Sequence, residues 1–311
     1  MDRKMHLEVI TMFTNFKELE AYVLAQNTKK RIALANAHDE PALSAVVNAK
    51  RKGVVEGTLI GKQDMIIDML HEMGEDEKDY EIINFDGEEL EAAKIAVKLV
   101  REGKADIPMK GILQTSSFAK AILNRETGLI PEGGRRLVSQ VGIFEYEDRF
   151  MMITDAAINI APDVETQIGI VENALPVANA LGIDCPKVAV LSAVETYNEK
   201  MPSTVSATEI ANRGIPGCIV SGPLALDGAI SMESVKHKSI KNPVAGQADI
   251  LLVPVIEVGN VLYKSITYIA GKTMASSICG ASCPVIITSR ADTPDSKYNS
   301  ILLAVLRCLK A

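Results

Sequence analysis

The sequence contains no tryptophan, and only 4% of its 311 residues are aromatic. Aromatic side chains supply the platforms on which proteins stack sugars and single-stranded nucleic acids. The sequence also lacks an excess of positive charge: its formal net charge is −7, and an acidic protein repels a phosphate backbone. We therefore expect no nucleic-acid partner, and any anionic ligand must be held by a local cluster of basic groups and backbone N–H donors.

Long apolar runs are missing as well. The longest, "ILLVPVI" from Ile250 and "ILLAVL" from Ile301, fall far short of the roughly 20 residues that a spanning helix needs. The N-terminal stretch "MDRKMHLEVITMF" has neither the apolar region nor the cleavage site of a signal peptide. These features predict a cytoplasmic protein without a membrane partner.

The sequence has few cysteines, and their spacing does not suggest disulfide pairs. The five cysteines are scattered, odd in number and mostly embedded in apolar runs, which favours reduced packing residues over a disulfide framework. Cys279 and Cys283 resemble half of a metal site, but no second pair and no nearby histidine completes a tetrahedral set. The four histidines are far apart in sequence. We therefore expect no metal.

What the sequence does contain is a repeated strand–helix alternation in a chain that is 47% hydrophobic. The clearest helix is 88–103, with acidic residues early and basic residues late. A second is 39–53, with Asp39 placed to cap it and Pro41 in its first turn. An antiparallel hairpin at 135–157 interrupts the alternation and is a candidate domain boundary. The predicted strands of the alternation are 31–37, 57–61, 80–85, 105–111, 187–194, 217–222, 248–255 and 276–289.

Mostly parallel sheets bind ligands beyond the carboxyl ends of their strands, so the loops there are where function is expected. In "MKGILQTSS" (109–117), Lys110 ends a strand, and Thr115 and Ser116 stand where a helix begins. Hydroxyls and free N–H groups at a helix start form an anion site to which Lys110 adds charge. An ordinary helix cap beside a surface lysine is the alternative.

Two further loops carry polar residues. Gly259 and Asn260 are expected to open a helix after a buried strand, and Asn260 and Lys264, four residues apart, then share one helix face. A surface polar pair is the alternative reading. In "MPSTVSATEIA" (201–211), Ser203 or Thr204 is expected to cap a helix.

The richest loop follows the last predicted strand, in "CPVIITSRADTPDSKYNSI" (283–301). A hydroxyl (Ser289), a guanidinium (Arg290) and two carboxylates (Asp292 and Asp295) lie within seven residues, which is more than a cap requires, although Asp292 or Thr293 also suits a cap. These four are candidate site residues.

Several familiar sequence motifs are incomplete or absent. "AGKTM" resembles the tail of a phosphate loop, but the required glycine is replaced by Ile266. No G-x-G-x-x-G follows an early strand, and G-x-S-x-G is absent. A nicotinamide site and a hydrolase elbow therefore have no support.

Six segments, in order along most of the chain from about residue 30, together resemble the phosphate acyltransferases, and the butyryltransferase branch more than the acetyltransferase branch. They are "MKGILQTSSFAKAILNRETGL", "ITDAAINIAPDV", "AVETYNEKMPST", "SGPLALDGAIS", "NPVAGQADILLVPVIEVGNVLYKS" and "CPVIITSRADTPDSKYNSI".

The resemblance implies a fold and a reaction. The fold is two three-layer α/β/α lobes with mostly parallel sheets and an interdomain cleft, as in isocitrate and isopropylmalate dehydrogenases. We expect one lobe from 1–133 plus 276–311 and the other from 134–275. The reaction is acyl-CoA plus inorganic phosphate giving acyl phosphate plus coenzyme A, with coenzyme A as a substrate and no cofactor. The family usually forms homodimers.

The resemblance also implies site roles. The family's serine and adjacent arginine match Ser289 and Arg290, but seven residues after the serine, where the family has its aspartate, this chain has Ser296. Asp295, slightly favoured, and Asp292 are the candidate bases. Lys110, Thr115, Ser116, Asn260 and Lys264 are the candidate substrate-binding residues, and Lys120, Arg135 and Arg136 are further cationic candidates.

Two departures from the family pattern leave other functions open. Ser221 and Val255 stand where the family often has acidic or amide side chains, and loss of a hydrogen-bonding group at a strand end can impair activity. A catalytically weakened homologue that senses acyl-CoA or acyl phosphate is therefore an alternative. A metal-dependent decarboxylating dehydrogenase on the same fold is a third reading, disfavoured by the lack of a spaced aspartate set.

Overall fold

The expected strand–helix alternation is present in a computed structural model, which describes residues 12–288 and 292–310. The chain divides into two compact units, which we call the first and second units. The first comprises Leu19–Val138 and the residues from Thr273 onward, and the second comprises Ser139–Lys272 with the residues up to Glu18. The lobe boundaries expected at 133 and 275 stay a prediction.

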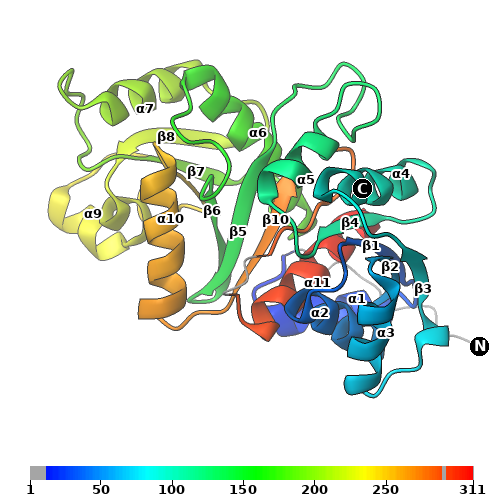
Figure 1. Cartoon of the computed structure of the whole chain (residues 1–311). Coiled ribbons are helices and arrows are strands. Elements are labelled where there is room, and N and C mark those ends of the chain that lie inside the picture. The colour runs from blue at the N-terminus through cyan, green and yellow to red at the C-terminus, as the bar shows by residue number, and fades with distance from the viewer. Residues whose placement is uncertain (1–11, 289–291, 311) are drawn as a thin grey trace, which may run out of the picture. The chain divides into compact units, whose positions relative to one another are not determined.

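The first unit is built on a parallel sheet with the strand order β3-β2-β1-β4 (Figure 1). Its strands are β1 (Lys30–Ala35), β2 (Val55–Gly61), β3 (Glu81–Asn84) and β4 (Ile107–Lys110). Beyond β4, Met109 pairs in parallel with Ile286, and the Lys110 N–H donates to the Ile286 carbonyl over 3.0 Å. The carboxyl ends of β1, β4 and the segment at Ile286 therefore lie at one edge.

Helices cover both faces of this sheet. Connections between parallel strands are right-handed, and the chain runs from β1 outward to β3 and then returns past β1 to β4, so α4 lies on the face opposite α2 and α3. The helix α2 packs on α11, and α4 packs on α5. Besides the four strands, the first unit contains most of α1 (Phe16–Ala25) and all of α2 (Glu40–Arg51), α3 (Gln63–Glu72), the 3₁₀ turn η1 (Glu77–Asp79), α4 (Glu89–Arg101), α5 (Thr115–Ile122), β10 (Met274–Cys279) and α11 (Pro294–Lys310).

The second unit contains the predicted hairpin, which continues into parallel strands in the order β5-β6-β9-β7-β8. Its strands are β5 (Ser139–Tyr146), β6 (Arg149–Thr154), β7 (Lys187–Leu191), β8 (Ile219–Leu224) and β9 (Ile250–Leu252). Its helices are α6 (Val164–Ala180), α7 (Pro202–Arg213), α8 (Leu226–Ile230), α9 (Met232–Lys238), α10 (Ile256–Lys264) and the π-helical η2 (Ser265–Ile269).

Of two predicted helix caps, one is in position without its side-chain hydrogen bond and the other is wrong. Asp39 occupies the N-cap position of α2, but its side chain accepts no hydrogen bond from the helix. The N-cap of α7 is Met201, because Pro202 begins the helix and places Ser203 and Thr204 inside its first turn. The Thr204 hydroxyl instead donates to the carbonyl of Met201 (2.8 Å) and accepts from the Asn198 N–H (2.9 Å).

Buried aliphatic residues form the core around the first sheet. In the first unit, Ile32 and Leu34 of β1, Leu59 of β2 and Ile107 of β4 are fully buried, as expected for a parallel sheet covered on both faces.

Within residues 12–288 and 292–310, no helix has the length and apolar content needed to cross a membrane.

Candidate functional site

Lys110 lies at the point where the strand order of the first sheet reverses, between β1 and β4, which is where open α/β sheets bind ligands. Its side chain is buried, with 9% of the residue exposed. The ammonium donates to the carbonyls of Gly111 (3.1 Å) and Leu113 (3.0 Å). The alternative of a surface lysine beside a cap is therefore wrong: the loop after β4 holds a buried cation at the sheet edge.

The end of β1 closes around this loop. Asn36 has a φ of 53°, a conformation that asparagine adopts more readily than most residues, and its amide Nδ2 donates to the Ile112 carbonyl over 3.2 Å. A Cβ on Gly111 would lie 2.2 Å from the Asn36 carbonyl oxygen. Glycine is therefore required next to Lys110, and Asn36 is a part of the site that sequence reasoning missed.

Thr115 and Ser116 are exposed in the first turn of α5, as expected, with Gln114 as the N-cap. Glu89 of α4 already occupies one donor of this helix start, because its carboxylate accepts from the Gln114 N–H over 2.8 Å. An anion bound here would lie near that carboxylate. The N-terminus of α5 is therefore a weaker anion site than the sequence suggested.

A pocket of about 740 Å³ lies beside α5 and contains three cationic side chains. Ser116 and Lys120 line it together with Arg125 and Arg136, and the Arg136 guanidinium donates to the Leu123 carbonyl. Ser116, Lys120 and Arg136 were candidates from the sequence, whereas Arg125 was missed. The pocket suits a multiply charged anion.

The segment with the most polar residues is described only at its two ends. Ser289 and Arg290 lie outside the described residues. Before them, Thr288 is buried; after them, Asp292 is half-buried and Asp295 is exposed in the first turn of α11. Strand pairing places Ile286, three residues before Ser289 in the sequence, at the same sheet edge as Lys110.

The cap of α11 is Thr293, one of the two residues expected to cap it. Its hydroxyl accepts from the Ser296 N–H over 3.1 Å and donates to the Ser296 hydroxyl over 3.1 Å. Ser296, which stands in the family's aspartate position, is buried and serves this cap. The next residue, Lys297, is also buried and was missed.

In the second unit, Asp155 follows β6 and organises the loop after it. Its carboxylate accepts from the N–H groups of Ala157 (2.9 Å), Ile158 (3.1 Å) and Asn159 (3.0 Å), and from the Asn159 side chain (2.6 Å). Burial raises the pKa of Asp155, and these hydrogen bonds oppose the increase. Asp155 was missed as a site residue, although an aspartate directly after a buried strand was a usable signal.

The loop shaped by Asp155 contacts α10. The helix begins at Ile256, with Val255 as an N-cap that has no side-chain hydrogen bond, so Gly259 and Asn260 lie in its second turn and the prediction that they open it is wrong. A Cβ on Gly259 would lie 2.6 Å from the Asp155 carbonyl oxygen. Asn260 donates to the Ala156 carbonyl over 3.3 Å, whereas Lys264 is exposed.

The structure therefore divides the predicted residues between the units. Lys110, Thr115, Ser116, Asp292 and Asp295 belong to the first, and Asn260 and Lys264 belong to the second. Among the described residues, no three histidine, cysteine or acidic side chains are grouped so that they could hold a metal ion.

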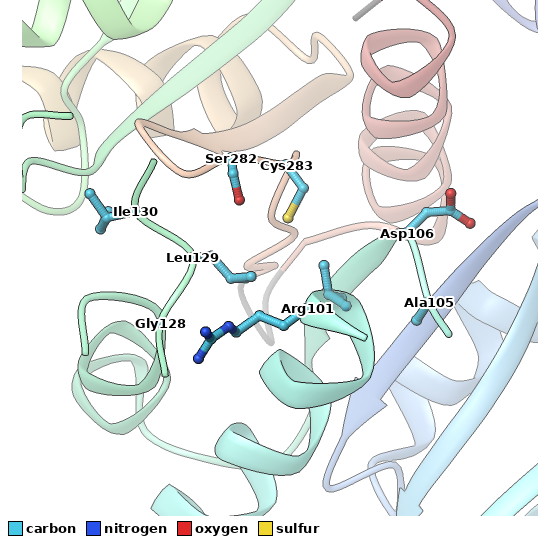
Figure 2. A pocket seen from close by; sticks show the side chains of 9 residues that line it. Arg101, Ala105, Asp106, Gly128, Leu129, Ile130, Ser282 and Cys283 are labelled. Carbon is cyan, nitrogen blue, oxygen red and sulfur yellow. The ribbon is translucent and has the colours of Figure 1, made fainter. Parts of the chain in front are cut away.

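Another pocket, of about 490 Å³, lies at the amino end of the first sheet (Figure 2). Arg101, Asp106, Leu129, Ser282 and Cys283 are among the residues that line it. Asp106 precedes β4, and its carboxylate accepts from the Arg31 N–H over 2.7 Å and pairs with Lys30 over 3.3 Å. Its carboxylate thus has partners within the protein, and none of the site candidates that the structure describes lines the pocket.

Comparison with known proteins gives consistent similarities. A family model described as phosphate acetyl/butaryl transferase matches residues 88–305. The chain is 44% identical over 301 residues to the phosphate butyryltransferase of Clostridium acetobutylicum, covering 95% of this chain and 98% of that protein.

Solved structures agree with these matches. The crystal structure of a branched-chain phosphotransacylase from Enterococcus faecalis V583 matches with a TM-score of 0.80 and 35% identity, covering 89% of this chain and 98% of that chain. A 4-hydroxythreonine-4-phosphate dehydrogenase from Klebsiella pneumoniae matches with a TM-score of 0.50 at 11% identity, over 89% of this chain and 98% of that chain, which shows the fold alone. The dehydrogenase-like α/β fold expected from the sequence is confirmed.

Proposed function

Because the chain belongs to the phosphate acetyl/butaryl transferase family, we propose that it transfers a butyryl or another short or branched acyl group between coenzyme A and inorganic phosphate, in the cytoplasm. It is an acyltransferase, and its substrates are acyl-CoA and phosphate in one direction and acyl phosphate and coenzyme A in the other. The similarity to a butyryltransferase and a branched-chain phosphotransacylase supports this acyl range.

One observation carries the proposal: a buried lysine at the switch point of a parallel sheet, beside the strand that leads to Ser289 and Arg290. An acidic protein needs such a local cation to bind phosphate. Lys110 supplies a positive charge for the phosphate, which is the nucleophile in one direction and the leaving group in the other. The Arg290 guanidinium adds two parallel N–H donors for two phosphate oxygens.

The chemistry needs a proton acceptor and an oxyanion donor. In the direction of acyl-CoA synthesis, the thiol of coenzyme A loses its proton and attacks the acyl carbonyl, a C–S bond forms, and the C–O bond to phosphate breaks. A thiol with a pKa near ~8.5 is only partly ionised at neutral pH, so a carboxylate base assists. The Ser289 hydroxyl donates to the developing oxyanion.

Asp292 and Asp295 are the two candidate bases. Asp292 is half-buried and Asp295 is exposed; reacting groups work best where bulk water is partly excluded, which supports Asp292. We expect Asp292→Asn to lower kcat more than Asp295→Asn does, and the reverse ranking would assign the base to Asp295. Steady-state rates at saturating coenzyme A decide between them.

The pocket lined by Ser116, Lys120, Arg125 and Arg136 is proposed to hold the phosphates of coenzyme A. Its three cations and its volume of about 740 Å³ suit a multiply charged group. Asn260 and Lys264, at α10, are proposed as substrate-binding residues of the second unit.

Acyl phosphate formation tests the proposed function directly. The enzyme is incubated with acetyl-, butyryl- or isobutyryl-CoA and phosphate, and the acyl phosphate is converted by hydroxylamine to a hydroxamate for quantification. We expect phosphate-dependent hydroxamate, with butyryl or isobutyryl exceeding acetyl. A higher rate with acetyl-CoA would contradict the proposed acyl range but not the reaction.

The second candidate function, an acyl-CoA or acyl phosphate sensor, is favoured by one observation: Val255, at the N-cap of α10, offers no side-chain hydrogen bond. Calorimetric binding of butyryl-CoA separates the two functions. Tight binding without hydroxamate formation for any acyl-CoA supports the sensor.

We also propose that the protein forms a homodimer through α10 and η2. Val258, Val261, Tyr268 and Ile269 are exposed large hydrophobic residues along one helical stripe, and among the described residues of α10 and η2 only Gly259 is buried. A contiguous apolar face of this kind marks a protein interface. Val261 is 65% exposed and Ile269 is 84% exposed.

The charges beside this stripe support a second copy of the chain as the partner. Glu257 and Lys264 lie two turns apart on one flank of the stripe. In a two-fold antiparallel packing, Glu257 of each copy faces Lys264 of the other. This contact and a substrate-binding role are alternatives for the Lys264 side chain.

Sedimentation velocity tests the dimer. Val261→Asp is expected to convert a dimer to a monomer, while the matched control Met65→Asp, at an exposed residue of α3, leaves it dimeric. A monomeric wild-type protein, or a Val261→Asp dimer of unchanged affinity, contradicts this interface.

A further inference from the structure

Lys297 is a buried lysine in an unfavourable position. It lies in the first turns of α11, and only 4% of the residue is exposed. Removing an ammonium group from water costs free energy, and the positive end of the helix dipole disfavours a cation there. A lysine kept in such a position needs a reason other than the stability of the helix.

The ammonium of Lys297 contacts a backbone carbonyl that lies outside the helix. The side chains of a helix lean toward its N-terminus, and the Lys297 ammonium accordingly reaches back and donates to the Asp292 carbonyl. Asp292 immediately precedes Thr293, the residue that caps α11. Lys297 therefore ties the helix start to the chain that enters it.

Asp292, one of the two candidate bases, is thereby anchored through its backbone carbonyl. The described residues before Ser289 are held by the sheet: the Ile286 N–H donates to the Pro108 carbonyl over 3.0 Å, the Ile286 carbonyl accepts from the Lys110 N–H over 3.0 Å, and Thr288 is buried. Lys297 supplies the corresponding contact at Asp292, at the start of α11.

We infer that Lys297 is a positioning residue that holds Asp292, a candidate base, in its active position, at a cost in folding stability. This inference rests on the proposed function. It predicts that activity and stability respond in opposite directions when the ammonium is removed, because a buried cation without a functional role destabilises a fold.

Lys297→Met tests the inference, since methionine has a similar length, no donor and no charge. We expect its urea unfolding midpoint to equal or exceed that of the wild type. We expect kcat/KM for phosphate to fall at least about tenfold, as for lost pre-organisation of transition-state contacts, mainly through kcat. Lys297→Arg, which retains a donor and a charge, is expected to recover part of that loss.

The matched control is Lys98→Met on α4, whose side chain is 75% exposed and lies 3.7 Å from Glu102. It removes one positive charge from the same unit and is expected to leave kcat/KM unchanged. A tenfold loss in this control would assign the effect of Lys297→Met to net charge and overturn the inference.

The possible failures are distinguishable. An active Lys297→Met enzyme overturns the inference and leaves the proposed function intact. A lower urea midpoint together with lost activity assigns Lys297 a merely structural role, which also overturns it. A wild-type enzyme without phosphate-dependent turnover contradicts the proposed function itself.

Discussion

Ser289 and Arg290 are the residues proposed to contact the oxyanion and the phosphate, respectively. We predict that Ser289→Ala and Arg290→Ala each lower kcat/KM by at least ~10-fold, because each removes a contact that strengthens in the transition state. Far-UV circular dichroism and the urea midpoint should match those of the wild type. Near-normal turnover in both variants would contradict this site assignment.

The cysteine thiols respond to burial in a way that can be measured. Burial raises the pKa of Cys283 to about 12 and those of Cys218 and Cys308 to about 11, whereas Cys185 is exposed. Only the thiolate reacts with alkylating reagents, so we predict that iodoacetamide modifies Cys185 first at pH 7.5. The other three should react as the pH approaches 11 or when urea unfolds the chain.

Mass spectrometry of peptides after timed labelling checks this order. Modification of Cys283 at the rate of Cys185 at pH 7.5 contradicts it, even though Cys283 lines the pocket in Figure 2. Unfolded protein, in which all five cysteines should react, serves as the control.

The candidate site was predictable from the sequence where a strand end carries an unusual polar residue, as at Lys110. Lys297 and Asp155 were missed for two different physical reasons. Lys297 lies in an amphipathic helix where a lysine is ordinary, and only packing reveals that it is buried. Asp155 acts through the hydrogen bonds of its own loop, which depend on a backbone conformation that sequence pattern does not specify.

Among the elements, β1 and β4 approach each other so closely at their carboxyl ends that Gly111 has no space for a side chain. We predict that Gly111→Ala destabilises the protein by about 1–3 kcal/mol through overpacking and lowers turnover at least ~10-fold by displacing Lys110. Urea unfolding and initial rates measure the two effects.

Gly74→Ala is the matched control for this variant. Gly74 has a φ of +76°, and an added Cβ would meet no atom within 4 Å, so alanine there costs only about 1 kcal/mol of backbone strain. Turnover should be unchanged in Gly74→Ala. Equal activity in the two variants would show that the close approach at Gly111 has no role in the site.

Element existence was easier to predict than element ends. The periodicity of α4 (Glu89–Arg101) and the short apolar run of β4 (Ile107–Lys110) marked both elements. The start of α10 was placed too late, because Val255 is a poor cap and Asn260 a good one by composition. The buried strand β9 and the contact of Gly259 with the Asp155 loop decide the helix start instead.

For the whole molecule, composition excluded classes of partner, whereas ordered motifs were needed to indicate the reaction. A net charge of −7 and the absence of tryptophan do not distinguish an acyltransferase from another enzyme on the same fold. The six motifs do, and the match over residues 88–305 confirms the family they predict. Acyl-chain preference depends on the volume of the acyl site, which no short motif encodes.

The most direct test of the central claim is release of free thiol from butyryl-CoA, followed with and without inorganic phosphate in the presence of a chelator. We predict thiol release that saturates with phosphate and is unaffected by the chelator, because the acyl group is transferred to phosphate by side chains alone. Release at the same rate without phosphate, or no release for any acyl-CoA that the protein binds, would contradict it.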